Sequence, residues 1–268
     1  MSVRPPAVAG AFYEARPDRL ERDVRSHLPP KSTPRPAFGV IVPHAGYVYS
    51  GPVAGAVYAQ IRIPSTCVVL CPNHTGFGAA AALDPSDAWR TPLGDVPVDR
   101  RLADRLATLA PSLEPDRVAH AREHSLEVQL PFLQVLRPDV AIVAICLGAP
   151  RLALCREVGD ALSTIAAAEA EPPLLVASSD MNHYESREEG RRKDDLALAR
   201  IGAIDPEGLF RTVLDESISM CGFLPATSLL FAARAAGRTA ARVVARRDSG
   251  DETEDTASVV GYAGVIVD

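Results

Sequence analysis

The chain has 268 residues, of which 47% are hydrophobic and 23% charged, a composition typical of a globular protein with an apolar core. Its formal net charge of −6 argues against nucleic acid as the main partner, because nucleic-acid binding normally needs a basic face. No apolar run reaches the roughly 18 residues of a membrane span, and residues 1–17 lack the apolar core of a secretory signal, so we expect a cytoplasmic protein.

Helical and strand-like patterns alternate along the chain. In its first half we predict, in order, a helix over 17–28, a buried strand over 38–43, a helix over 52–61, a buried strand over 66–71, and a turn-rich segment, able to form a hairpin, over 84–99. In its second half we predict helices over 100–109 and 125–136, a strand over 140–148, a helix over 151–168, a strand over 174–180, helices over 186–204, 206–215 and 225–236, and strands over 241–246 and 258–267.

The alternation of strands and helices indicates the fold class. Continuous runs of Val, Ile and Leu separated by helices are typical of a sheet that is covered on both faces. Such alternation favours parallel pairing, although the last two strands can run antiparallel at one edge. We therefore predict a single α/β domain over residues 1–268, with a mostly parallel or mixed central sheet and helices on both faces.

Titratable side chains follow three of the four predicted core strands. His44, in the stretch PHAGY, follows the first strand, and His74 follows the second. Asp180 and His183 follow the fourth strand, in SSDMNHY. In open α/β sheets, functional sites form beyond the carboxyl ends of the strands. We therefore expect these four side chains to lie near one another. The alternative for Asp180 and His183 is that both only bond the backbone of their turn.

Five cysteines, an odd number in a chain of this length, do not suggest a disulfide framework. Cys221 precedes Gly222 in a predicted loop, directly ahead of a helix, and is therefore available to a functional site. The other four lie within predicted strands or a helix and are expected to be core residues: Cys67, Cys71, Cys146 and Cys155.

The segment REHSLEVQLPFL carries further candidates that no strand places. His124 and Glu127 lie about one helical turn apart and can face the same way. A role in the site and a role in helix capping or packing both fit them. His120, in a polar stretch, is expected at the surface. Tyr47 and Tyr49, which follow His44, can either line a pocket or pack in the core.

Taken in order, several motifs resemble those of the Memo family, also called AmmeMemoRadiSam system protein B. They are AGAFYEA, PHAGYVYSG, CPNHTGF, WRTPLGD, EHSLEVQLPFL, SSDMNHY, CGFLP and VVGYAGVIV, and they extend over essentially the whole chain. The resemblance implies one α/β domain similar to that of the LigB-type, class III extradiol dioxygenases, which are non-heme iron enzymes.

The resemblance also implies a set of site residues. In Memo proteins two histidines and one cysteine bind a metal ion, reported as iron or copper. The matching motifs assign these roles to His44, His74 and Cys221, and they place Asp180, His183 and His124 beside the metal. The dioxygenases complete their triad with a carboxylate, whereas here a thiolate takes that place. A thiolate favours copper or zinc more than a carboxylate does, and it can itself be oxidised.

These residues support three hypotheses. The first is a metal-dependent, dioxygenase-like redox protein acting on an unknown small substrate, with His183 moving protons and His124 and Asp180 in support. The second is a non-catalytic module that binds a peptide or protein in the same cleft, as the signalling adaptors among the eukaryotic Memo proteins imply. The third is a zinc-dependent hydrolase. The resemblance further implies association with radical-SAM and AMMECR1-type proteins.

Overall fold

Four short apolar runs form the centre of a mixed β-sheet in the computed structural model, which describes residues 2–30 and 33–268. In spatial order they are β2 (Gly39–Val42), β9 (Leu174–Ser178), β3 (Thr66–Pro72) and β8 (Ala141–Leu147). All three contacts between neighbours are parallel, so the carboxyl ends of the four strands lie at one edge of the sheet. Every residue of β2 and β9 is buried, as expected for central strands covered on both faces.

Antiparallel strands extend the sheet on both sides. β12 (Val259–Val267) pairs with β2, and both β11 (Ala241–Asp248) and β10 (His183–Glu185) pair with β12. On the other side β4 (Ala81–Leu83) pairs with β8, and β7 (Glu114–Pro115) pairs with β4. Among the described residues this sheet has nine strands. A second sheet is formed by β1 (Val3–Arg4), β5 (Ala88–Thr91) and β6 (Gly94–Pro97).

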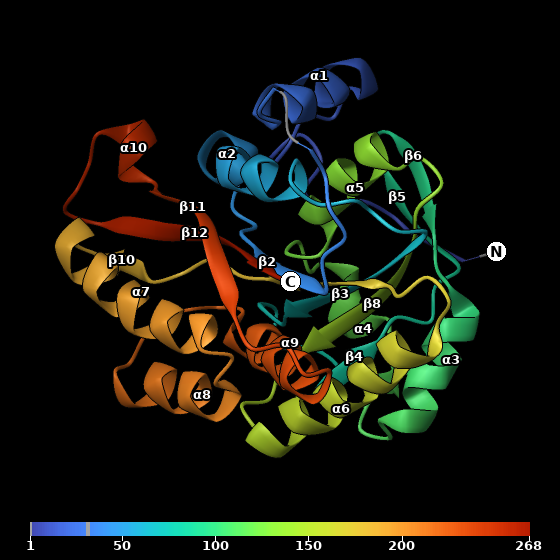
Figure 1. Cartoon of the computed structure of the whole chain (residues 1–268). Coiled ribbons are helices and arrows are strands. Elements are labelled where there is room, and N and C mark those ends of the chain that lie inside the picture. The colour runs from blue at the N-terminus through green and yellow to red at the C-terminus, as the bar shows by residue number, and fades with distance from the viewer. Residues whose placement is uncertain (1, 31–32) are drawn as a thin grey trace.

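Helices cover both faces of the large sheet (Figure 1). One face packs against α3 (Arg100–Leu109), α6 (Leu152–Ala168), α7 (Arg187–Gly202), α8 (Pro206–Asp215) and α9 (Phe223–Ala235). The other packs against α1 (Pro17–His27), α2 (Tyr47–Tyr58), α5 (Leu130–Leu136) and the small sheet. The short helices are α4 (Val118–Ala121), the 3₁₀ turn η1 (Glu127–Gln129) and α10 (Gly250–Thr253). Alternate residues of β2 separate accordingly: Ile41 faces the first layer, and Val40 and Val42 face the second.

The predicted α/β class, the mixed sheet and its two helical layers are confirmed. The hairpin expected within 84–99 is β5–β6. Two helix boundaries differ from the prediction. α2 begins at Tyr47, one turn before Pro52, because a proline near the start of a helix removes only a single intrahelical hydrogen bond. The helix predicted over 125–136 is divided into η1 and α5, and Pro131 lies in the first turn of α5.

Membrane insertion was not expected from the sequence. Among the described residues, the structure contains no helix that combines the length and the apolar character needed to cross a bilayer.

Close packing of α6 against α9 gives a test of the core. A Cβ atom added at Gly159 of α6 would lie 2.7 Å from the carbonyl oxygen of Ser228 on α9, inside van der Waals contact. We expect Gly159→Ala to lower the free energy of unfolding by about 1–3 kcal/mol, because the helices must move apart. Urea denaturation measures this change.

Gly190 of α7 is the matched control, because a Cβ atom there meets nothing closer than 3.9 Å. Gly190→Ala should raise the free energy of unfolding by up to about 1 kcal/mol, since alanine loses less backbone entropy in a helix. Equal stability of the two variants would contradict this account of the α6–α9 contact.

Candidate metal centre

A pocket of about 630 Å³ lies beyond the carboxyl ends of the parallel strands. Five of the six candidate site residues line it, together with Tyr49: His44, His74, His124, Asp180 and His183. Phe12 and Tyr262 add aromatic surface from the N-terminal segment and from β12. The sequence prediction that the residues after β2, β3 and β9 meet at one edge therefore matches their positions.

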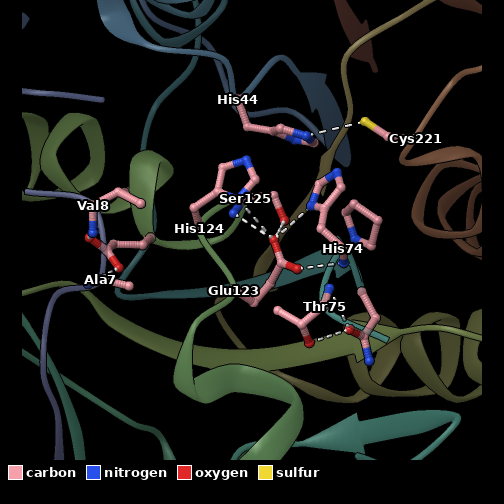
Figure 2. Close-up of polar contacts among 12 residues, drawn as sticks. Ala7, Val8, His44, His74, Thr75, Glu123, His124, Ser125 and Cys221 are labelled. Carbon is pink, nitrogen blue, oxygen red and sulfur yellow. Dashed lines mark hydrogen bonds and ion pairs between the residues drawn. The ribbon is translucent and has the colours of Figure 1, made fainter. Parts of the chain in front are cut away.

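The three candidate metal ligands converge from distant parts of the chain. His44 follows β2, His74 follows β3, and Cys221 lies in the loop before α9. One ligand atom from each lies within 4.8 Å of the other two. The Cys221 Sγ is 3.2 Å from the His44 Nε2, as the dashed line in Figure 2 marks. The His44 and His74 rings meet edge to face, with their centroids 5.2 Å apart.

Hydrogen bonds assign the tautomer of His44. The Ser178 hydroxyl donates its single proton to the carbonyl oxygen of Ser125, at 2.6 Å. The Gln129 amide donates to the same hydroxyl at 2.9 Å. The Ser178 Oγ can therefore only accept from the His44 Nδ1, which lies 2.9 Å away. A proton on Nδ1 leaves the lone pair on Nε2, the nitrogen that faces Cys221.

Asp180 holds the backbone around these ligands. Its Oδ1 accepts the His44 backbone N–H at 2.7 Å, and its own N–H donates to the Cys221 Sγ at 3.4 Å. Burial raises the pKa of the Asp180 carboxyl. Burial, together with the charge of Asp180, also raises the pKa of the Cys221 thiol. Asp180 thus lies beside the candidate ligands, and its carboxylate bonds the backbone of His44 rather than that of its own turn.

Two further histidines lie beside the three candidate ligands. The His183 Nδ1 donates to the carbonyl oxygen of Ser219 at 2.9 Å, so Nε2 is the ring nitrogen that can accept a proton. The His124 ring stacks on His74 at 4.8 Å between centroids and meets His44 edge to face at 5.5 Å. Burial lowers the pKa of His124, although the charge of Glu123 opposes this shift. Both histidines line the pocket.

The carboxylate that contacts the histidines is Glu123, not Glu127. Glu123 lies directly below His74 and His124 in Figure 2 and accepts the His74 Nδ1–H at 2.9 Å. The turn that begins at Ser125 is not a regular α-helix, so the helical spacing that favoured Glu127 does not apply. In the sequence, Glu123 was marked as a possible site residue only by its position directly before His124 and Ser125. Ser178 and Gln129 carried no signal, because they act through contacts across the fold.

Glu127 instead anchors the N-terminal segment to the core. Its buried carboxylate pairs with the Arg4 guanidinium, and it accepts the Val8 N–H at 3.0 Å and the Tyr13 O–H at 2.6 Å. This segment carries Phe12 into the pocket, where its ring lies 4.7 Å from the ring of His124. Glu127 therefore shapes one wall of the pocket without contacting it.

Three other expectations have outcomes in the structure. His120 was predicted at the surface, and this was wrong: its side chain is fully buried and lies against the ring of Trp89. Of the two tyrosines after His44, Tyr47 packs in the core and donates to the Val128 carbonyl oxygen at 2.6 Å, whereas Tyr49 lines the pocket. The four cysteines other than Cys221 are buried, as predicted.

The fold and these side chains define an α/β protein with a candidate metal centre at the carboxyl ends of its parallel strands. A family model described as "Memo-like protein" matches residues 4–266. The chain therefore belongs to the Memo family, as its motifs indicated.

Relatives and a solved structure agree with this assignment. The MEMO1 family protein of Methanopyrus kandleri is 39% identical over 277 residues, which cover 98% of each chain. The MEMO1 family protein of Aquifex aeolicus is 39% identical over 269 residues, covering 99% of each. The crystal structure of an uncharacterized protein from Escherichia coli K12 matches with a TM-score of 0.58 and 17% identity, covering 85% of this chain and 98% of that one. At that identity the likeness extends to the fold alone.

The buried Arg4–Glu127 pair yields a prediction about stability. Both side chains are almost inaccessible, at 4% and 0% exposed. We expect Glu127→Gln to lower the free energy of unfolding by about 3–5 kcal/mol, because it leaves a buried guanidinium without its counter-charge. Urea denaturation measures the change. Glu21→Gln is the control, since Glu21 pairs with Arg25 at an exposed position, and its loss should cost less than about 1 kcal/mol.

A further buried acid, Asp194 of α7, holds the residue that precedes β10, the strand that begins with His183. The Asp194 Oδ1 accepts the N–H of Asn182, next to His183, at 2.9 Å. Burial raises the pKa of Asp194 to about 6, and the charges of Asp195 and Asp248 act in the same direction. The folded state therefore holds a proton on Asp194 at a pH where the unfolded chain has already lost it.

This difference predicts how stability depends on pH. Because the folded-state pKa is raised, the contribution of Asp194 to stability is fully present below pH about 4 and is lost as the pH rises through about 6. Relative to Asp194→Asn, the wild-type protein should lose about 2–3 kcal/mol of unfolding free energy between pH 4 and 7. Urea denaturation of both proteins over this range checks it. Parallel pH profiles would contradict the raised pKa.

Proposed function

We propose that the chain is a metal-dependent redox protein in which His44, His74 and Cys221 hold one metal ion beside a small-molecule pocket. The observation that supports this most directly is the convergence of the three ligand atoms within 4.8 Å. These residues come from three separate segments and do not form a local sequence cluster. Two imidazoles and one thiolate are among the donors that transition metals prefer in proteins.

The spacing of the donors fits a metal ion. Ligands about 2.0–2.3 Å from one tetrahedral ion lie roughly 3.3–3.8 Å from each other. The Cys221 Sγ and the His44 Nε2, at 3.2 Å, are already near this range. The widest separation among the three, at most 4.8 Å, needs a closure of only about 1 Å. The tautomer of His44 also suits ligation, since its Nε2 lone pair faces the sulfur.

Iron or copper is a better candidate than zinc for the bound ion, because the family resemblance connects this site with redox chemistry. A bound iron or copper ion would supply one-electron redox chemistry. The sulfur ligand separates this centre from the dioxygenase triad with its carboxylate, so the reaction need not be ring cleavage. Zinc with the same ligands would instead support hydrolysis, and the metal content decides between the two.

The residues around the ligands supply the remaining functions. The His183 Nε2 can accept a proton from a molecule in the pocket, because its Nδ1 is occupied by the Ser219 carbonyl. His124 presents a second imidazole to the same space. Asp180 orients the His44 backbone. The pocket volume of about 630 Å³ suits a small molecule, and the aromatic rings of Phe12, Tyr49 and Tyr262 favour an apolar portion in that molecule.

The proposal predicts the metal content of purified protein. Anaerobically prepared wild-type protein should carry close to one iron or copper per chain by elemental analysis and should consume dioxygen when a reductant is supplied. His44→Ala and Cys221→Ser should each lose most of the metal and the oxygen uptake, because two ligands alone hold an ion weakly. Cys155→Ala is the control, since Cys155 is a buried thiol in α6 outside the pocket, and it should retain the metal.

Three results would overturn this function. Tight zinc without dioxygen uptake would favour the hydrolase. A protein that binds none of the three metals, yet binds a peptide in the pocket, would favour the binding module. Retention of the metal in both ligand variants would show that the ion binds elsewhere.

A further inference from the structure

Glu123 is a buried carboxylate that accepts four hydrogen bonds. Its side chain is fully buried, at 0% exposed. One oxygen, Oε2, accepts the backbone N–H of His74 at 2.7 Å. The other, Oε1, accepts from the His74 Nδ1 at 2.9 Å, from the Ser125 N–H at 2.9 Å and from the Ser125 hydroxyl at 2.6 Å. Glu123 thus holds both the backbone and the ring of one candidate ligand.

These contacts determine which nitrogen of His74 carries a proton. Two backbone N–H groups and the Ser125 hydroxyl already donate to the Glu123 oxygens, which is the pattern expected around a carboxylate that only accepts. The His74 Nδ1, 2.9 Å from the same Oε1, therefore donates as well. When the ring carries a single proton, that proton is on Nδ1 and the lone pair is on Nε2. Figure 2 shows this second nitrogen pointing toward His44 and Cys221.

Ser125 connects the partners of the two rings. Its N–H and its hydroxyl donate to Glu123, the partner of His74. Its carbonyl oxygen accepts from the Ser178 hydroxyl, which is the partner of His44. Ser125 therefore links the hydrogen-bond partners of both imidazoles through a single residue.

We propose that Glu123 is a positioning residue that fixes the Nδ1–H tautomer and the orientation of His74, and that Ser125 couples this constraint to His44. The inference rests on the proposed metal centre, for which it explains how both histidines present Nε2 toward one point. A carboxylate behind a ligating histidine also raises the basicity of the ring, and loss of such a partner typically lowers metal affinity by about 10–100-fold.

Glu123 does not itself complete a second metal site. Ligand atoms of His74, Glu123 and His124 also lie within 4.8 Å of one another. However, four hydrogen bonds already occupy the Glu123 oxygens, and the nearer His74 nitrogen carries the proton that Glu123 accepts. An ion there would displace this proton and break the bonds that hold His74. The cluster therefore acts as a support for the first site.

The tautomer is tested first in metal-free, wild-type protein. Two-bond proton–nitrogen NMR spectra distinguish the protonated nitrogen of each imidazole, recorded at a pH where His74 is neutral. We expect the Nδ1–H form for both His74 and His44. In Glu123→Gln the His74 ring should lose this preference, because a glutamine cannot accept from Nδ1 and from both backbone N–H groups at once. An Nε2–H tautomer of His74 in the wild-type protein would overturn the inference, whatever the protein does with metals.

Metal affinity gives the second readout, by chelator competition with Co²⁺ as a spectroscopic probe. Glu123→Gln should bind Co²⁺ about 10–100-fold more weakly than wild type, and Ser125→Ala, which removes one of the four bonds, should lie between them. Glu123→Asp should not restore wild-type affinity, because the shorter side chain cannot reach both His74 groups from the same backbone position.

Asp84→Asn is the matched control. Asp84 is also a buried carboxylate that accepts from the backbone and hydroxyl of a serine two residues later, Ser86, and from a ring N–H, that of Trp89. Trp89 is not a candidate ligand, so Asp84→Asn should lower thermal stability without weakening Co²⁺ binding. Equal losses of affinity in Asp84→Asn and Glu123→Gln would reduce Glu123 to a structural role.

The outcomes separate this inference from the proposed function. If wild type binds no Co²⁺, or if His44→Ala binds it as tightly, the metal centre is wrong, while the NMR result still decides the tautomer. If His44→Ala abolishes binding but Glu123→Gln binds as wild type does, the positioning role alone fails.

Discussion

Parallel pairing of β2, β9 and β3 is the constraint on which the site depends, because it brings three carboxyl ends to one edge of the sheet. Val42 pairs with Ser178, so the residues that follow these two strands start from adjacent positions. Cys221 reaches the same edge from the far end of the chain. Gly222 permits this approach: its N–H donates to the Ser179 hydroxyl at 3.0 Å, and any side chain there would collide with the Ser178 carbonyl oxygen.

Buried carboxylates then join segments that the sheet alone does not place. Glu123 holds the segment after β3, Asp180 holds the segment after β2, and Glu127 holds the N-terminal segment. Each accepts at least one backbone N–H, which compensates the cost of removing its charge from water. Backbone donors cannot move away without disturbing the fold, so these bonds fix the chain more firmly than contacts between flexible side chains do. Acids outside the ligand set therefore hold the backbone where the histidines of the pocket lie.

The sequence predicted the parts of the site that follow directly from strands. Apolar runs located the core strands, and the residues after them gave His44, His74 and Asp180 by position alone. Cys221 needed its loop context and the family motifs, because no strand leads to it. Glu123 and Ser178 could not be found in this way, since each acts through a contact with a histidine, 49 and 134 residues away respectively. Ser125 could not be found either, because its hydrogen bonds join these two partners of the histidines. The same limit explains the error at His120: polar neighbours in sequence suggested the surface, whereas the fold packs its ring against Trp89.

The three candidate ligands differ in how firmly they are held. The rings of His44 and His74 each have a hydrogen-bonded partner behind the nitrogen that faces away from the centre. The Cys221 sulfur accepts the Asp180 N–H at 3.4 Å and lies in the loop between α8 and α9; it also contacts the His44 Nε2 at 3.2 Å and the Asp180 carbonyl oxygen at 3.8 Å. Within the proposed centre, the sulfur would be the ligand that adjusts when an ion binds, because a loop carries it, whereas a hydrogen-bonded side chain holds each of the two rings from behind. Metal–sulfur and metal–nitrogen bonds differ by about 0.2–0.3 Å, and an adjustable thiolate beside two held imidazoles would accommodate that difference. Under the proposed function, this centre would select its ion by donor chemistry more than by a rigid cavity size.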